Sequence, residues 1–90
     1  MRALNSQTEA TAELSLAQLP LGTQARVVGI KGSGQIARRL MEMGVVPGAP
    51  VRVIKAAPLG DPIEIRVRGY HLALRLTEAA TILVTTISDK

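Results

Sequence analysis

The only histidine and the only tyrosine of the chain are neighbours, His71 and Tyr70, in the segment IEIRVRGYHLALR at residues 63–75. Imidazole is a common metal ligand, and Glu64 would be the diagonal neighbour of His71 if this segment forms a hairpin. A closed metal site usually takes four ligands, and one imidazole with one carboxylate supplies only two. We therefore expect a solvated edge histidine and no intrinsic metal site.

A second candidate site is KGSGQIA, residues 31–37, which has the G-x-G-x-x-A spacing of a dinucleotide-binding turn. In that motif an acidic residue about 20 positions further on binds the ribose, but Ile54 and Lys55 stand there. The Lys and Ser/Thr that follow the last glycine of a phosphate-binding P-loop are absent too. We expect Ser33 or Gly34 to cap a helix, and an anion at the helix N-terminus is the alternative.

Catalytic chemistry finds little support in the residue types. The seven acidic residues are scattered, there is no cysteine, and no base is evident beside a serine. The lack of cysteine removes disulfides, thiolate metal sites and a thiol nucleophile. A chain of 90 residues also has little room for a cleft that excludes water. We expect a non-enzymatic protein with no catalytic residue, no metal ligand set and no cofactor.

Apolar and polar residues alternate on both sides of Arg68-Gly69, which we expect to form the two-residue turn of a hairpin. This turn sets apolar residues opposite one another, and the predicted pairs are Val67 with Tyr70, Ile65 with Leu72 and Ile63 with Leu74. His71 then lies opposite Arg66 on the other face. A shift by one residue would set the apolar row against arginines, so the pattern fixes the register. It also predicts that Tyr70 is buried.

A helix is predicted from Ser33 onward. Ile36, Leu40 and Met43 follow the helical period and should face the core, with polar residues on the other side. Gly44 is placed to cap the C-terminal end, because glycine readily adopts the left-handed conformation that ends many helices. This helix is the only long one that the pattern predicts.

Short strands account for most of the remaining chain. Residues 24–31 and 51–56 are rich in β-branched residues, and Pro47-Gly48 suits a type II turn that leads into the second of them. We read residues 77–80 as a short turn and residues 81–87 as a last strand. About five short strands with one helix between them predict a small, strongly bent barrel of mainly β class.

The beginning of the chain divides into two parts. Residues 1–13 are polar and small without a lasting period, and we interpret them as a flexible N-terminal arm. A short helical turn should follow, with Leu16 and Leu19 facing the core. The domain is predicted to span residues 14–88. No apolar run of signal-peptide or membrane-spanning length is present, which favours the cytoplasm.

Positive charge and exposed apolar residues suggest where a partner would bind. The formal net charge is +4, which suits an acidic partner or a membrane face, although a simple solvated surface is the favoured explanation. The end of the predicted helix adds an apolar cluster that could be core or an adaptable contact surface. The predicted partner interface consists of Arg38, Arg39, Met41, Met43, Val45 and Val46.

Several segments together resemble a known family. They are the spacing of Leu16, Leu19 and Gly22, then RRLMEMGVVPGAPVRVI, and finally PLGDPIEIRVRGYHLALRLTEAATILV. In their order and spacing they look like ferrous iron transport protein A, the FeoA family, over roughly residues 14–88. The resemblance implies an SH3-like β-barrel with an added helix. It further implies a cytosolic accessory protein that binds and modulates FeoB, the GTP-binding membrane transporter of ferrous iron uptake.

Two other functions remain open at this point. One is a basic small-barrel RNA-binding protein, which is less favoured because base stacking needs aromatic side chains and only Tyr70 is available. The other is an accessory domain of a metal-dependent transcriptional regulator, whose SH3-like domains are similar. The latter would require a DNA-binding partner chain. Weak self-association through an open edge strand is a further expectation.

Overall fold

The computed structural model describes residues 14–32 and 34–87, so the predicted arm at 1–13 and the domain boundary at residue 88 lie outside the described residues. The described part is one mainly β structure in which six strands form a single antiparallel sheet. The elements in chain order are β2 (Leu14–Ser15), the 3-10 helix η1 (Leu16–Gln18), β3 (Gln24–Ile30), α2 (Gln35–Glu42), β4 (Pro50–Ala56), β5 (Ile63–Val67), β6 (Tyr70–Leu74), α3 (Leu76–Ala79) and β7 (Ile82–Thr86).

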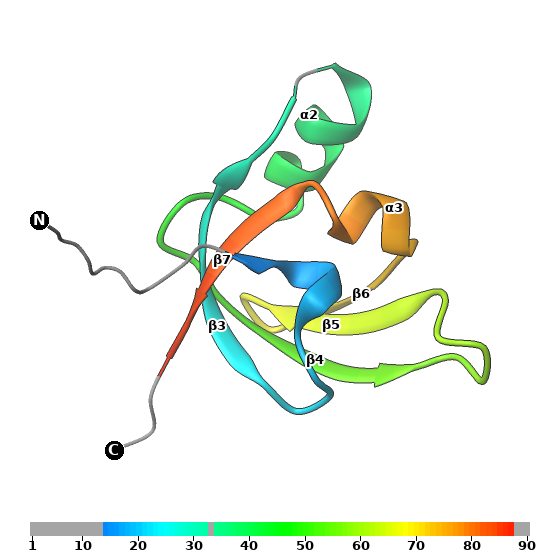
Figure 1. Ribbon diagram of the computed structural model, residues 1–90. Coiled ribbons are helices and arrows are strands. Elements are labelled where there is room, and N and C mark those ends of the chain that lie inside the picture. Colours follow the sequence, from blue (N-terminus) through cyan, green and yellow to red (C-terminus); the bar gives the residue numbers. More distant parts are fainter. Residues whose placement is uncertain (1–13, 33, 88–90) are drawn as a thin grey trace, which may run out of the picture.

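The sheet is strongly curved. Its strand order is β2-β7-β3-β4-β5-β6, which leaves β2 and β6 at the edges. The register shifts between Val27 and Gly29 in β3 and between Val53 and Lys55 in β4, and such bulges bend a strand and increase its twist. Figure 1 shows the strands curling around a common interior, with α2 standing at one end and η1 crossing the sheet.

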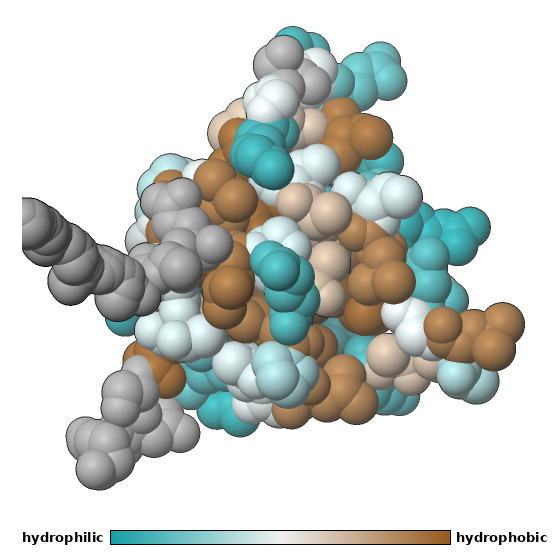
Figure 2. All heavy atoms as spheres, in the orientation of Figure 1, coloured by the Kyte–Doolittle hydropathy of each residue, from teal (hydrophilic) through white to brown (hydrophobic). Residues whose placement is uncertain are grey.

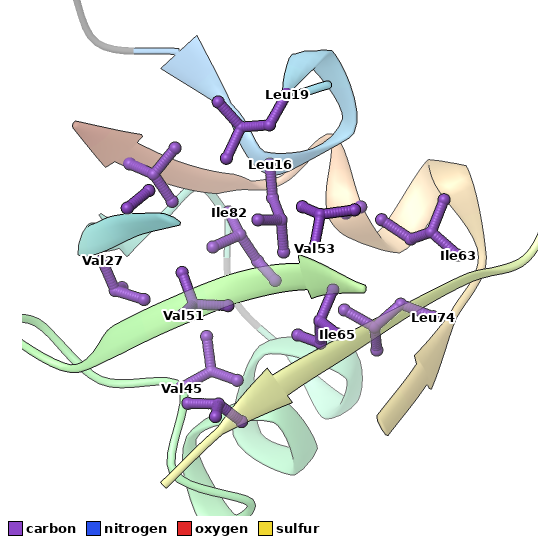
Figure 3. Packing of buried hydrophobic residues seen from close by; sticks show 14 of the residues in the cluster. Leu16, Leu19, Val27, Val45, Val51, Val53, Ile63, Ile65, Leu74 and Ile82 are labelled. Carbon is purple, nitrogen blue, oxygen red and sulfur yellow. The ribbon is translucent and has the colours of Figure 1, made fainter. Parts of the chain in front are cut away.

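The interior is filled by aliphatic side chains. Leu16, Ile65 and Ile82 have no exposed surface, and they come from η1, β5 and β7 respectively. Figure 3 shows these three side chains and Val53 of β4 pointing toward one another. No polar or charged side chain is buried within the described residues. Burial of these apolar groups is therefore the main source of the stability of the domain.

The hairpin has the predicted register. Val67 pairs with Tyr70, Ile65 with Leu72, Ile63 with Leu74 and Arg66 with His71. Arg68 and Gly69 both have positive φ, at 52° and 84°, as a type I′ turn requires at its two central positions. The strands at 24–30 and 50–56, the last strand and the core positions of Leu16 and Leu19 are confirmed as well.

The prediction that Ile36 faces the core is wrong, because 48% of its surface is exposed. The buried residues of α2 are Ala37 and Leu40, so the contact row runs from Ala37 and not from Ile36. Alanine has a small side chain, and its position on this row lets the helix approach the rest of the domain closely. The bulkier Ile36 consequently lies on the solvent side.

Two local elements also differ from the sequence prediction. Residues 77–80 were expected to form a turn, but Leu76–Ala79 form the short helix α3. The carboxylate of Glu78 accepts the backbone N–H of Arg75 at 3.0 Å, and Asp61 Oδ1 accepts that of Leu76 at 3.0 Å. These bonds satisfy N–H groups that a helix start leaves free. The edge strand β2 has only two residues and was not predicted.

Candidate interaction surface

The end of α2 is held in place by its own backbone. The N–H of Gly44 donates to the carbonyl of Met41 at 3.0 Å, and that of Val45 donates to Leu40 at 3.0 Å. With Gly44 at φ 101°, these two bonds form a Schellman motif, which ends a helix and brings an apolar residue back against it. The predicted role of Gly44 at the helix end is therefore confirmed.

The following turn is also as predicted. Gly48 has φ 91°, and the N–H of Ala49 donates to the carbonyl of Val46 at 3.0 Å. This is the arrangement of a type II turn with Pro47 and Gly48 at its centre. This turn leads the chain directly into β4. The motif that ends α2 and the turn together fix the position of α2 relative to the sheet.

The six residues of the predicted interface differ in their exposure to solvent. Val45 is only 1% exposed and belongs to the core, so it cannot contact a partner. Val46 and Met43 are half-buried and pack against the core. Arg38, Arg39 and Met41 are exposed. We call the remaining five residues the α2 surface, which consists of Arg38, Arg39, Met41, Met43 and Val46.

The α2 surface combines positive charge with apolar contact area. Met41 exposes 47% of its surface beside the two exposed arginines. Neither arginine forms a salt bridge within the described part of the chain. Figure 2 shows hydrophilic and hydrophobic side chains close together where α2 stands in Figure 1. Arginine and methionine are both enriched in protein interfaces, and flexible methionines adapt to different partner shapes.

A groove of about 370 Å³ lies between the end of α2 and the hairpin. We call it the α2–hairpin groove, and its lining residues are Glu42, Met43, Gly44, Arg68, Tyr70 and Leu72. Met43 is shared with the α2 surface. The groove joins two segments that are about 25 positions apart in the sequence, which is why the sequence pattern did not identify it.

Tyr70 was predicted to be buried, but 66% of its surface is exposed. Its pairing with Val67 is as expected, so the predicted strand register was correct and the predicted burial of the side chain was wrong. Along β6, Leu74 is buried, Leu72 is half-buried and Tyr70 is exposed. Burial decreases toward the turn because β6 is an edge strand, and fewer elements cover its far end. The sequence did contain one indication of this exposure, namely that Tyr70 directly follows the hairpin turn.

His71 and Glu64 form a close pair on the outer face of the hairpin. His71 Nδ1 lies 3.0 Å from Glu64 Oε2, and Lys55 Nζ lies 3.9 Å from Glu64 Oε1. The contact between His71 and Glu64 was expected from the hairpin geometry. Within residues 14–32 and 34–87 no third His, Cys, Asp or Glu joins them in a group that could hold a metal ion.

The glycine-rich segment before α2 caps the helix through its backbone. Gly34 is the N-cap residue, and its carbonyl accepts the N–H of Arg38 at 3.0 Å. Gly34 has φ 98°, a conformation that glycine adopts without a steric penalty. One of the two predicted caps is thus confirmed, while Ser33 lies outside the described residues.

Arginines also line the outer face of the sheet. Arg52 and Arg66 lie directly opposite each other on β4 and β5, and Arg52 donates to the carbonyl of Gly22 at 3.2 Å and to Gln24 Oε1 at 2.8 Å. Arg26 donates to the carbonyl of Gly48 at 2.8 Å. Like charges opposite each other in a sheet are unfavourable. This face would therefore be stabilised by an acidic partner.

Comparison with known proteins is consistent with this geometry. The family model described as FeoA domain matches residues 14–86. A fusion protein of Fe(2+) transport protein A and the Fe(2+) transporter FeoB from Porphyromonas gingivalis is 40% identical over 76 residues. That match covers 84% of this chain and 9% of the relative, so the chain spans only a small part of the fusion protein.

Solved structures show the same fold. An FeoA-like protein from Clostridium acetobutylicum is 36% identical with a TM-score of 0.81, and the match covers 90% of this chain and 94% of that one. FeoA of Stenotrophomonas maltophilia, described as a procaryotic SH3 domain protein and solved in complex with zinc, is 37% identical with a TM-score of 0.72. That match covers 79% of this chain and 88% of the other.

A more distant similarity concerns the fold alone. A manganese-dependent transcriptional repressor is 18% identical with a TM-score of 0.77, over 90% of this chain and 45% of that chain. The similarity to the Stenotrophomonas maltophilia protein identifies the curved sheet of this chain as an SH3-like fold. No helix in the described part of the chain is both long and apolar enough to cross a bilayer.

Proposed function

The chain belongs to the FeoA domain family, a family associated with ferrous iron transport, and from this membership we propose that it binds an FeoB-type transporter and modulates it. In this proposal it is a non-enzymatic protein that works at the cytosolic face of the membrane. Its action is binding, and it has neither a catalytic site nor a cofactor of its own.

The observation that carries the proposal is the fusion of the two proteins in one relative. In the Porphyromonas gingivalis protein, the related domain and FeoB share one polypeptide. A covalent link keeps two domains at a high effective concentration, so that even weak contacts between them are populated. The fusion therefore supports a direct contact between the two domains.

The α2 surface is the part of the molecule that we assign to this contact. Arg38, Arg39 and Met41 are exposed residues of α2, which stands at one end of the molecule in Figure 1. Rim arginines speed association and exclude wrong partners, while desolvated apolar groups supply affinity. We therefore expect an acidic patch with an apolar centre on the transporter.

The two alternative functions are less well supported. Tyr70 is exposed, which removes one argument against RNA binding, but a single aromatic ring is fewer than most single-strand binders use for stacking. The regulator hypothesis rests on a similarity at 18% identity, which shows the fold alone. Family membership favours the transport role over both.

The test is affinity purification of the tagged chain from detergent-solubilised membranes, followed by identification of the bound proteins. The test variant is Arg38→Asp/Met41→Asp, which changes only exposed residues of the α2 surface. A matched control is Lys31→Asp/Leu59→Asp, which makes the same change of charge and a similar change of hydrophobicity on exposed residues outside the α2 surface and the hairpin. We expect the transporter to be recovered with the native chain and the control. Absence of the transporter from the native sample would refute the proposed function.

A further inference from the structure

The strand β6 is an edge of the sheet formed by residues 14–32 and 34–87. Among these residues it pairs only with β5, and the two-residue turn makes Val67 and Tyr70 a hydrogen-bonded pair. Backbone groups alternate in direction along an antiparallel strand. Those of Tyr70, Leu72 and Leu74 therefore bond to β5, while the N–H and carbonyl groups of His71 and Ala73 point to the open side. An extended segment could bond to both residues without disturbing the hairpin.

The two faces beside this edge differ in character. Tyr70 and Leu72 border the α2–hairpin groove of about 370 Å³, and Met43 forms part of its opposite wall. A strand added to β6 would place every second side chain in line with Tyr70 and Leu72. Apolar residues at those positions would enter the groove and cover part of the exposed ring of Tyr70.

The other face carries positive charge. His71 lies opposite Arg66, and Arg75 stands just beyond the end of β6, all of them exposed, whereas Arg68 borders the groove. Four acidic residues lie near this region. Glu64 is within 3.0 Å of His71 and 3.9 Å of Lys55, and Glu42 stands at the groove. Glu78 and Asp61 accept the backbone N–H groups of Arg75 and Leu76. Arg66 and Arg75 form no salt bridge within the described part of the chain, so acidic side chains at the alternate positions of an added strand would be stabilised by pairing with them.

We propose that β6 binds an extended segment of a partner protein as an additional strand, and that in this segment apolar and acidic residues alternate. Main-chain hydrogen bonds supply affinity in such strand addition, and pockets for alternate side chains supply specificity. The proposed function suggests the transporter as the source of the segment. The strand addition itself is tested without the transporter.

A second copy of the chain fits this edge poorly. The segment YHLAL of β6 has no acidic residue, and antiparallel pairing of two β6 strands would bring Arg68 of each copy close to Arg75 of the other. Opposed like charges destabilise a sheet. Charge complementarity therefore selects an acidic segment from another protein.

The experiment is an NMR titration of the full chain with the synthetic peptide acetyl-Val-Glu-Val-Glu-Val-Glu-Val-amide. The comparison peptide has Lys in place of each Glu. We expect saturable shifts at residues 70–74 with the acidic peptide, together with slower hydrogen exchange at the amides of His71 and Ala73. The Lys peptide should not saturate. Absence of saturation with the acidic peptide, or equal binding of both peptides, would overturn the proposal.

Variants test the geometry of the edge. Ala73→Pro removes an N–H that points to the open side and is not used in the hairpin, which edge strands tolerate. We expect about tenfold weaker peptide binding, the upper range for one hydrogen bond. Ala73→Ser keeps the backbone donor at the same position and serves as control, with less than about threefold change because the position is exposed and the N–H is retained. If the folded Ala73→Pro variant binds as tightly as the native chain, the proposed pairing is wrong.

Tyr70→Glu provides a second variant that does not depend on proline being accommodated. It places a negative charge at the groove, on a position that is 66% exposed, so folding should be preserved. We expect this variant to weaken binding of the acidic peptide at least as strongly as Ala73→Pro does. Unchanged binding, or sedimentation showing that native chains pair through β6, would contradict the assignment. If the transporter is not recovered in the purification but the acidic peptide binds, only the proposed function fails.

Discussion

Gly44 is the residue on which the position of the α2 surface depends most directly. Its φ of 101° lies where side chains are rarely accommodated, and an added Cβ would stand 2.9 Å from Cδ of Arg68. These two obstacles differ in strength. The side chain of Arg68 is exposed and can move, whereas the backbone conformation is fixed by the end of the helix.

Gly44→Ala should therefore lower the free energy of unfolding by about 1–3 kcal/mol, most of it from backbone strain. Urea denaturation measures this difference. Gly48→Ala is the control for strain alone, because Gly48 has φ 91° and nothing within 4 Å of an added Cβ. Introducing Arg68→Ala beside Gly44→Ala should recover less than half of the loss. Full recovery would show that crowding by Arg68 is the main cost.

Individual residues also show the limits of sequence reasoning. Ile36 and Tyr70 were predicted to be buried, but both are exposed. For Ile36 the periodicity placed the buried row on the wrong residue, because the row begins at Ala37. For Tyr70 the face was correct, but periodicity does not indicate how far the neighbouring elements extend over it. The contact between His71 and Glu64 was predictable, because it depends only on pairing within one hairpin.

At the scale of elements, the hairpin was the best predicted part. Its turn, its register and the separation of its two faces follow from local alternation around Arg68-Gly69. The α2–hairpin groove could not be predicted in the same way, because it depends on the angle at which α2 leaves the sheet. That angle is set by two turns and by tertiary packing, for which the sequence has no periodic signal.

Side chains are buried to different extents along the hairpin, and this difference should appear in the free energy of unfolding. Ile65 has no exposed surface, so Ile65→Ala should lower the free energy of unfolding by about 2–5 kcal/mol through lost burial and a residual cavity. Tyr70→Ala should cost less than about 1 kcal/mol, roughly the value of one cross-strand pair. Urea unfolding of both variants is the measurement. Comparable losses would place Tyr70 in the core, as the sequence pattern had indicated.

For the whole molecule, the fold class was predictable from short strands, tight turns and one helix in a short chain. The order of the strands and the small edge strand β2 were not, because they depend on contacts between distant segments. The association with ferrous iron transport followed from the resemblance of ordered motifs, which the family match supports. Burial excludes Val45 from the predicted interface, since an apolar residue after a helix cap is often drawn into the core, and the role of the other five residues stays a prediction.

The molecule as a whole offers two regions for a partner, the α2 surface and the edge of β6. They are joined by the α2–hairpin groove, in which Met43 lies close to Tyr70 and Leu72 as lining residues of one cavity. A transporter segment that binds at the edge could therefore continue onto the α2 surface. Changes at either region should weaken binding, while exposed residues elsewhere should have little effect.

The central claim is that this chain binds an FeoB-type transporter through the α2 surface, and a direct titration of the purified transporter with the chain tests it. We expect saturable binding, and at least tenfold weaker binding for Arg38→Asp/Met41→Asp, because reversed charge at an interface removes more than about 1.4 kcal/mol. The control Lys31→Asp/Leu59→Asp should change the Kd by less than about threefold, as expected for substitutions outside an interface. No saturable binding of the native chain, or equal losses in both variants, would contradict the claim.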